Sequence, residues 1–275
     1  MQIPVAPAVM GILNVTPDSF SDGGCYVNLD TAMCQVKEMV EAGVDIIDIG
    51  GESTRPGAQS VSTQQELDRV IPVIQAIHSQ HEIMVSIDTS KPTVMEQAVL
   101  AGAGMINDVC ALSQDGAMQA AASLKVPVCL MHMQGSPRTM QENPQYNDVC
   151  HDVTDWLAQR MEQCVDSGIM QENILLDPGF GFGKSLEHNL SLFTCVKAFA
   201  RMGAGVVVGV SRKSMFSQLL NLPLNERDTI STVAAALAWN AGARIVRVHD
   251  TKHAIQARDF ICAYSDAKGA ITNDS

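Results

Sequence analysis

VDIIDIGGESTR, residues Val44–Arg55, decides the fold: it is a short apolar run that ends abruptly in a Gly-rich polar cluster. A run of this length is typical of a strand covered on both faces, as in a parallel sheet. Polar groups directly after such a strand lie at its carboxyl end, where α/β proteins build their sites. The stretch therefore predicts one strand–helix unit and indicates where function would be found.

The same unit recurs along the whole chain. Eight apolar runs, each followed by a helical pattern, are candidate strands: Ala8–Asn14, Val44–Gly50, Ile83–Asp88, Gly104–Val109, Val126–Met131, Asn173–Asp177, Gly205–Val210 and Ala243–His249. Eight such units in 275 residues favour a closed (β/α)8 TIM barrel. Pattern alone leaves an open, doubly wound sheet as the alternative. No linker is visible, so we expect a single α/β domain over residues 1–275, with a frayed polar tail at about 266–275.

The segments between the runs carry helix boundary signals. Thr63-Gln-Gln-Glu66 fits a capping box, in which Thr63 would begin the helix. The apolar residues after it fall on one helical face: Leu67, Val70, Ile71, Ile74 and Ile77. Gly43, Gly102 and Gly242 follow helical patterns at the place where a left-handed residue commonly ends a helix.

Composition excludes several classes of partner. Lys and Arg number 18 against 30 Asp and Glu, which gives a formal charge of −12. A surface this acidic repels phosphate backbones and anionic lipid, so we expect neither nucleic acid nor a membrane as partner. The start of the chain, MQIPVAPAVMGILNV, lacks the basic residues of a signal peptide. The 8 cysteines never form C-x-x-C and are interpreted as reduced apolar fillers in a cytoplasmic protein.

Polar residues stand at the ends of nearly all eight runs, and the carboxyl ends of barrel strands open on one face. They are Asn14, Glu52–Arg55, Asp88, Asn107, Asp108, His132, Asp177, Ser211–Lys213, Arg247 and His249. A carboxylate at the end of a buried strand is costly unless another group pairs with it. Convergence of so many clusters therefore predicts one shared site.

The clusters divide by chemistry. Carboxylates and an amide at Asp88, Asn107 and Asp177 suit a flat heterocycle with an amino-imine edge. Positive charge suits a phosphate or diphosphate, and its candidates are Arg55, Arg212, Lys213, Arg247 and His249. The side-chain oxygen of Asn14 is compatible with a magnesium ion that keeps most of its waters. Phe180 and Phe182 in the Gly-rich turn are candidates for stacking on a ring, with core packing as the alternative.

Two apparent motifs fail on inspection. Gly179–Ser185, GFGFGKS, resembles a phosphate-binding P-loop, but the first glycine of that motif would be position 178, which is Pro178. His249 and His253 are four residues apart, as in a zinc-binding helix, yet the first of them closes a strand. Neither a nucleotide loop nor a zinc site is therefore expected.

The polar clusters lie in segments that resemble those of bacterial dihydropteroate synthases. The segments are MGILNVTPDSFSDGG (Met10–Gly24), DIGGESTRPGA (Asp48–Ala58), SIDTSKP (Ser86–Pro92), INDV (Ile106–Val109), LMHMQGSP (Leu130–Pro137), LDPGFGFGK (Leu176–Lys184), GVSRKSM (Gly209–Met215) and RVHD (Arg247–Asp250). They follow one another in the family's order over nearly the whole chain. The resemblance implies a TIM barrel that condenses (7,8-dihydropterin-6-yl)methyl diphosphate with p-aminobenzoate, giving 7,8-dihydropteroate and pyrophosphate in folate biosynthesis.

The resemblance also implies roles for the matched residues. The pterin would be held by Asp88, Asn107, Asp177 and Lys213. The p-aminobenzoate pocket would be formed by Phe20, Thr54, Pro56, Phe182, Ser211 and Lys213. The diphosphate would be bound by Asn14, Arg55, Arg247 and His249, with Asn14 as the ligand of Mg²⁺. Asp88, Lys213, Arg247 and His249 would be the catalytic groups, and the family's enzymes are homodimers inhibited by sulfonamides.

The implied reaction is a substitution in which the pterin methylene loses pyrophosphate early and becomes cation-like before the aniline nitrogen attacks. Two other classes remain open. One is a pterin-binding methyltransferase domain that serves a corrinoid protein, and the other is a non-catalytic pterin binder. The first would not need Ser53–Pro56 or Ser211–Lys213, and only a synthase releases pyrophosphate together with dihydropteroate.

Overall fold

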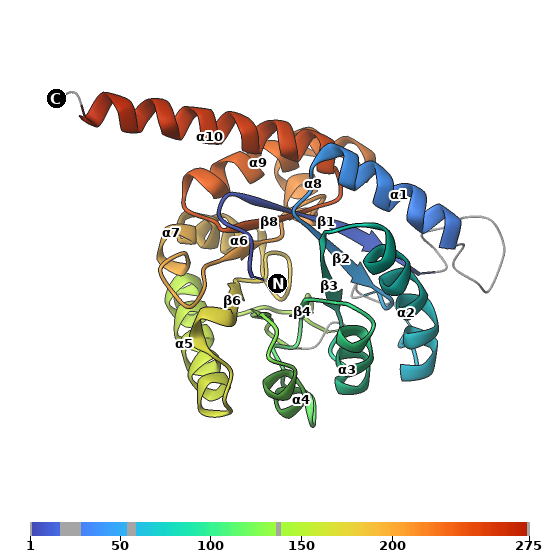
Figure 1. The fold of residues 1–275 in the computed structure, drawn as a ribbon. Coiled ribbons are helices and arrows are strands. Elements are labelled where there is room, and N and C mark those ends of the chain that lie inside the picture. Colours follow the sequence, from blue (N-terminus) through green and yellow to red (C-terminus); the bar gives the residue numbers. More distant parts are fainter. Residues whose placement is uncertain (1, 17–28, 54–58, 136–138, 274–275) are drawn as a thin grey trace.

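The computed structural model describes residues 2–16, 29–53, 59–135 and 139–273, and it forms a ring of strands surrounded by helices (Figure 1). The eight strands that it contains are β1 (Ala8–Asn14), β2 (Ile46–Gly50), β3 (Met84–Asp88), β4 (Met105–Asp108), β5 (Val128–Met131), β6 (Ile174–Asp177), β7 (Val207–Val208) and β8 (Ile245–Val248). Each lies inside a run that the sequence predicted. The eight-stranded α/β architecture is thus confirmed.

All neighbouring strands are parallel, in the order β6-β5-β4-β3-β2-β1-β8-β7. The two outer strands, β6 and β7, meet through the bridge between Leu176 and Val206. The amide of Ala204 also donates to the carbonyl of Ile174 at 2.7 Å, so the ring closes there on few hydrogen bonds. This closure excludes the open doubly wound alternative.

Helices cover the outside of the ring (Figure 1). They are α1 (Leu29–Ala42), α2 (Thr63–Gln80), α3 (Pro92–Leu100), α4 (Ala117–Leu124), α5 (Val149–Asp166), α6 (Leu186–Thr194), α7 (Val196–Phe199), α8 (Ser214–Leu220), α9 (Asp228–Asn240) and α10 (Thr251–Asn273). Their apolar stripes pack against the outward faces of the strands, as in Val70, Ile74 and Ile77 of α2, which are fully buried. Burial of this layer supplies most of the driving force for folding.

The predicted helix boundaries hold with one shift. The cap of α2 is Ser62 rather than Thr63. The hydroxyl of Ser62 accepts from the backbone amide of Gln65, and the side-chain oxygen of Gln65 accepts from the backbone amide of Ser62. The capping box therefore lies one residue earlier than predicted. Gly43, with a φ of 92°, adopts the left-handed conformation expected after α1, and Gly102 and Gly242 do so after later helices.

Two expectations differ from the structure. Cys150 and Cys195 form a disulfide between the start of α5 and the end of α6, so they are not reduced fillers. Cys129 and Cys164, by contrast, are buried free thiols. The polar residues after 265, expected to fray, continue α10 as far as Asn273. Within the described ranges, no helix has both the length and the apolar character that crossing a membrane requires.

Candidate functional site

The inside of the barrel changes from apolar to polar along the strands. Side chains alternate between the two faces of a strand, so every second residue points inward. A buried inner layer contains Ala8, Met10, Ile46, Met84, Met105, Cys129, Leu175, Val207 and Ile245. Two positions further along five of these strands are the polar residues Asp48, Ser86, Asn107, Asp177 and Arg247. The apolar layer closes the floor, and polar groups line the carboxyl-terminal mouth.

An ion-pair cluster occupies this mouth. The guanidinium of Arg247 donates from Nε to Asp48 at 2.7 Å and from Nη2 to Asp88 at 2.8 Å. The side-chain amide of Asn107 donates to the same oxygen of Asp48 at 3.0 Å. Residues from β2, β3, β4 and β8, which the sequence separates by as many as 199 positions, thus meet in one network. The predicted convergence of Asp88, Asn107 and Arg247 is confirmed.

Asp48 is a site residue that the sequence analysis missed. It is 0% exposed, and among the described residues its Oδ1 atom has no hydrogen-bond partner. An unsatisfied buried carboxylate oxygen is costly and is commonly explained by a function. The signal was present in the sequence, because an acid in the middle of the run IIDIG lies on the same face as the inward Gly50.

Burial raises the pKa of two carboxylates at the mouth, Asp88 and Asp177. The pKa of Asp88 is raised because the side chain is desolvated and because Asp48 lies nearby, although Arg247 opposes the shift. The pKa of Asp177 is also raised by burial, against a hydrogen bond from the Gly179 amide at 2.7 Å. Three carboxylates, Asp48, Asp88 and Asp177, share the mouth with two cations, Arg247 and Lys213. The cluster therefore favours a ligand that donates hydrogen bonds or carries positive charge.

Lys213 lies at the start of α8 and faces the same space. Burial lowers the pKa of Lys213 to about 8, while Asp177 opposes the shift and Arg247 adds to it. Its ammonium nitrogen is 4.1 Å from the centre of the Phe182 ring. Phe182 is thus half-buried against a site cation, and its predicted stacking on a substrate ring stays a prediction. Phe180 is fully buried against Phe193 and belongs to the core.

Ser211 and His249 form a separate pair beside this cluster. The Ser211 hydroxyl lies 3.0 Å from Nδ1 of His249 and accepts from the His249 amide at 3.1 Å. Arg212, between Ser211 and Lys213, does not join them, which corrects its assignment to the positive group. Its φ of 57° directs the side chain toward α9, where it binds both oxygens of Asp228 at 2.6 and 2.8 Å.

Two further polar ends serve loops rather than the mouth. Asp108 points away from the barrel interior and accepts from the amides of Cys110 and Leu112 at 2.8 and 2.7 Å. His132 is buried and contacts the ammonium of Lys184 at 3.0 Å. Both residues were predicted to belong to the shared site at the strand ends, and both instead stabilise loops just outside the barrel mouth. His253 pairs with Asp250, and the described residues contain no cluster of three His, Cys, Asp or Glu side chains suited to a metal.

Oxygen donors at the ends of β1 and β3 fit a magnesium ion. The register places Asn14 beside Gly50, and Gly50 beside Asp88. A Cβ on Gly50 would lie 3.6 Å from Oδ1 of Asn14 and 3.7 Å from Oδ2 of Asp88, so the glycine leaves room between two oxygen donors. Mg²⁺ commonly keeps several waters and binds one or two protein oxygens together with substrate phosphates. Phe20, Thr54, Arg55 and Pro56 lie outside the described residues.

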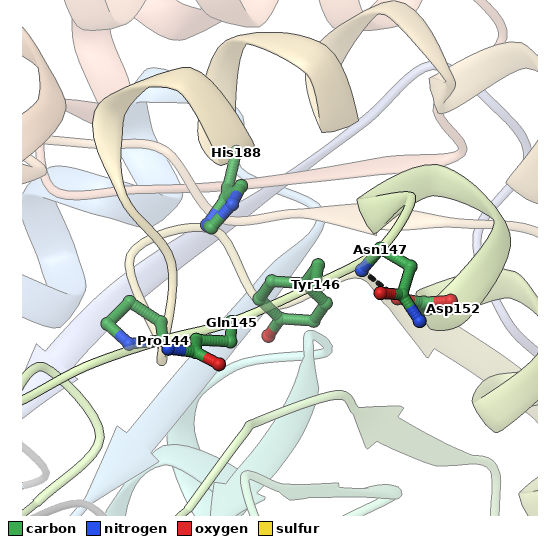
Figure 2. Close-up of a pocket in the computed structure, with 6 residues that line it drawn as sticks. All are labelled: Pro144, Gln145, Tyr146, Asn147, Asp152 and His188. Carbon is green, nitrogen blue, oxygen red and sulfur yellow. Dashed lines mark hydrogen bonds between the residues drawn. The ribbon is translucent and has the colours of Figure 1, made fainter.

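A shallow cavity of about 510 Å³ lies behind the loop that follows β6. It is lined by Pro144, Gln145, Tyr146, Asn147, Asp152 and His188 (Figure 2). The sequence analysis assigned a role to none of these residues. Tyr146 connects the cavity to the loop, because its hydroxyl donates to the carbonyl of Gly183 at 2.8 Å.

The sequence of this chain matches a known enzyme family. The model of the pterin binding enzyme family matches residues 10–249. The dihydropteroate synthase of Escherichia coli K12 is 50% identical over 262 residues, which cover 95% of this chain and 93% of the relative. The chain belongs to the dihydropteroate synthases. As a member of this family it is a transferase of folate biosynthesis, and its eight-stranded ring is the family's TIM barrel.

Solved structures of dihydropteroate synthases superpose closely on this fold. The Yersinia pestis synthase with a sulfonamide drug complex matches with a TM-score of 0.91 and 47% identity, covering 97% of this chain and 100% of that one. The Xanthomonas albilineans synthase with 4-aminobenzoic acid matches with a TM-score of 0.88 and 44% identity, covering 95% and 93%. The corrinoid-methyltransferase alternative is therefore set aside, since every named relative here is a synthase.

Proposed function

We propose that the synthase reaction takes place at the barrel mouth, around the ion-pair cluster of Asp48, Asp88, Asn107 and Arg247. Each residue predicted from the sequence has its own role there. Asp88, Asn107, Asp177 and Lys213 bind the dihydropterin. Asn14, Arg55, Arg247 and His249 bind the diphosphate, and the p-aminobenzoate pocket is formed by Phe20, Thr54, Pro56, Phe182, Ser211 and Lys213. The observation that carries the proposal is the single network joining Asp48, Asn107, Asp88 and Arg247.

Charge supports this division of labour. Two nitrogens of Arg247 are held by carboxylates, which fixes the plane of its guanidinium at the mouth. Fixed positive groups that face a developing negative charge lower the barrier without reorganising. Arg247 and His249 would stabilise departing pyrophosphate, and a magnesium ion held through Asn14 would add Lewis-acid neutralisation of that charge. Asp88 would stabilise positive charge on a cation-like pterin while the aniline nitrogen attacks.

Binding and turnover separate this proposal from a non-catalytic pterin binder. Mixed with both substrates and Mg²⁺, the protein should release pyrophosphate in a 1:1 ratio with dihydropteroate, and binding without release would refute catalysis. Asp88→Ala should weaken pterin diphosphate binding about a hundredfold by calorimetry, since it removes a buried charged acceptor. The fold should persist in this variant because Arg247 still forms its ion pair with Asp48. Unchanged affinity would remove Asp88 from the site.

We also propose a homodimer built on the late helices. Val233 and Leu237 of α9 and Phe260 and Tyr264 of α10 are exposed large apolar side chains on two helices in contact. Exposed apolar groups gathered in this way commonly mark an interface. Sedimentation should give a dimer that Leu237→Glu dissociates, whereas Glu162→Lys on α5 should leave it intact. A monomeric native protein would contradict the proposal.

Sulfonamides should inhibit by competing with p-aminobenzoate, since the Yersinia pestis relative is solved with such a drug. Inhibition that is insensitive to p-aminobenzoate concentration would contradict this. We further propose a cytoplasmic location, which the buried free thiols Cys129 and Cys164 support. Cell fractionation followed by alkylation would test it and would show whether Cys150 and Cys195 are oxidised in the cell.

A further inference from the structure

The loop after β6, Pro178–Ser185, packs closely against the segment that follows β5. Gly179, Gly181 and Gly183 all have positive φ values between 64° and 78°. A Cβ on Gly179 would lie 1.9 Å from the carbonyl oxygen of His132, and one on Gly183 would lie 2.5 Å from that of Gln134. The backbone therefore approaches the neighbouring segment so closely that glycine is needed.

Lys184 holds this loop together from inside. Its side chain is only 3% exposed, and its ammonium donates to the carbonyl of Gly179 at 2.9 Å and to that of Phe182 at 3.0 Å. The third close partner is Nδ1 of His132 at 3.0 Å. A fourth, longer contact joins the ammonium to the carbonyl of His132 at 3.5 Å. A protonated Lys184 has only donors, so in that form His132 accepts at Nδ1 and carries its proton on Nε2.

Other side chains fix the rest of the loop. Asn189 accepts from the amide of Gly181 at 2.7 Å, and Tyr146 donates to the carbonyl of Gly183 at 2.8 Å. His188, whose ring packs edge-on against Tyr146 with centroids 4.9 Å apart, closes the cap of α6 with Ser185 (Figure 2). Lys184 differs from these groups because it alone among them joins both ends of the turn that carries Phe182 into the site.

We propose that Lys184 is a positioning residue for the p-aminobenzoate half of the reaction. By tying the carbonyls of Gly179 and Phe182 to one ammonium, it holds the Phe182 ring against Lys213, 4.1 Å from the Lys213 nitrogen. Lys184 itself touches no substrate in this account. The inference rests on the proposed role of Phe182 and Lys213 in the p-aminobenzoate pocket.

In the described part of the chain, Lys184 is surrounded by few charged groups. Burial lowers the pKa of Lys184 to about 7; Asp177 of β6 opposes the shift and Lys213 of α8 adds to it. Burial and the charge of Lys184 lower the pKa of His132 to about 3, so His132 is neutral near pH 7. Tyr146, before α5, places its ring 6.0 Å from the ammonium. Of these, only Asp177 and Lys213 are mouth residues.

A double-mutant cycle tests the proposal. Lys184→Met removes all donors, and it should raise the KM for p-aminobenzoate about tenfold or more, a loss of the size expected for a misplaced contact. The dissociation constant of pterin diphosphate and the kcat should stay within about threefold. Phe182→Leu should have a similar effect on this KM. If Lys184 acts through Phe182, the double variant should be no worse than Phe182→Leu alone.

Several outcomes would overturn it. These are an unchanged KM in Lys184→Met, equal losses for both substrates, or additive effects in the double variant. Tyr146→Phe, which frees only the Gly183 carbonyl, is the matched control and should change the KM less. Lys184→Gln keeps two donors and should be intermediate. Failure of both Lys184 variants to fold would show that the lysine serves the fold alone. Failure of the wild-type protein to form dihydropteroate would refute the proposed function instead.

Discussion

Two lysines hold segments at the barrel mouth, the partly buried Lys91 and the buried Lys184, and they are paired in opposite ways. Lys91, directly before α3, forms ion pairs with Glu52, which follows β2, and with Glu66 of α2, whose side chain is 1% exposed. After β6, Lys184 contacts the carbonyls of Gly179 and Phe182, more distantly that of His132, and a neutral imidazole. Within the described part of the chain, no carboxylate is among its hydrogen-bond partners. Charge pairing holds Glu52 at the end of β2, whereas hydrogen bonds to the backbone hold the loop after β6.

The pKa values follow the pairing. Burial opposes protonation of Lys91, but its hydrogen bonds to Glu52 and Glu66 outweigh burial and raise its pKa above the usual value. Burial dominates at Lys184 and lowers its pKa to about 7. The same residue type therefore stabilises one loop as a permanent cation and the other as a group near its titration point. Burial alone does not set the charge of a lysine; its partners do.

The largest difference in stability is expected between alanine substitutions of one glycine in each segment, Gly179 and Gly51. Gly179→Ala introduces a Cβ that would lie 1.9 Å from the backbone oxygen of His132. The φ of 72° at this position is also unfavourable for alanine, and the backbone on either side cannot shift to relieve the clash. We expect a loss of about 4 kcal/mol or more in the free energy of unfolding. Gly51→Ala, in the other loop, meets Val70 Cγ1 at 2.8 Å and should cost about 1–3 kcal/mol, because side chains can shift. Urea unfolding of both variants measures the difference, and equal losses would contradict it.

Removing each lysine should also give unequal losses of stability. Lys91→Met leaves the buried Glu66 carboxylate without its cation, which costs about 3 kcal/mol. Lys184→Met leaves only neutral acceptors and relieves the burial of a charge, so about 1 kcal/mol is expected. The order of the two melting temperatures at pH 7 checks this. A larger loss at Lys184 would mean that its charge is better compensated than its neighbours indicate.

The pH dependence of stability should have opposite signs for the two lysines. The pKa of Lys184 is about 7 in the folded chain against 10.5 in the unfolded one, so unfolded chains bind more protons between these values. Its contribution to stability therefore rises with pH across that window, by up to about 1.4 kcal/mol per pH unit. The raised pKa of Lys91 gives a contribution present below 10.5 that is lost at higher pH. Subtracting each Met variant's stability curve from that of the wild type isolates these slopes, and parallel slopes would refute the assignment.

The sequence predicted the site residues whose position follows from the regular alternation of strands and helices. Asp88, Asn107, Asp177 and Arg247 end apolar runs, and a parallel barrel brings such ends together whatever lies between them. Asp48 was overlooked because it lies within a run rather than at its end. Strand alternation places it on the inward face, so its role at the site could have been predicted from the sequence.

Other features depend on local backbone conformation and could not be read from residue types. Arg212 and Lys213 are adjacent and both basic, yet the left-handed φ of Arg212 sends it to Asp228 while Lys213 enters the site. Lys184 appeared in a failed P-loop pattern and in a segment that resembles the family, but neither predicted a role for it. Its partners Gly179, Phe182 and His132 are set by the path of the loop. The disulfide between Cys150 and Cys195 likewise requires knowing that α5 lies beside α6.

A crystal structure with dihydropterin diphosphate and Mg²⁺ bound would test the assembled mouth directly. The account predicts that the ring lies among Asp88, Asn107 and Asp177, with the diphosphate against Arg247 and His249 and the ion next to Asn14. A pterin bound outside the barrel mouth, or one that leaves the Arg247 and Asp88 pair untouched, would contradict it.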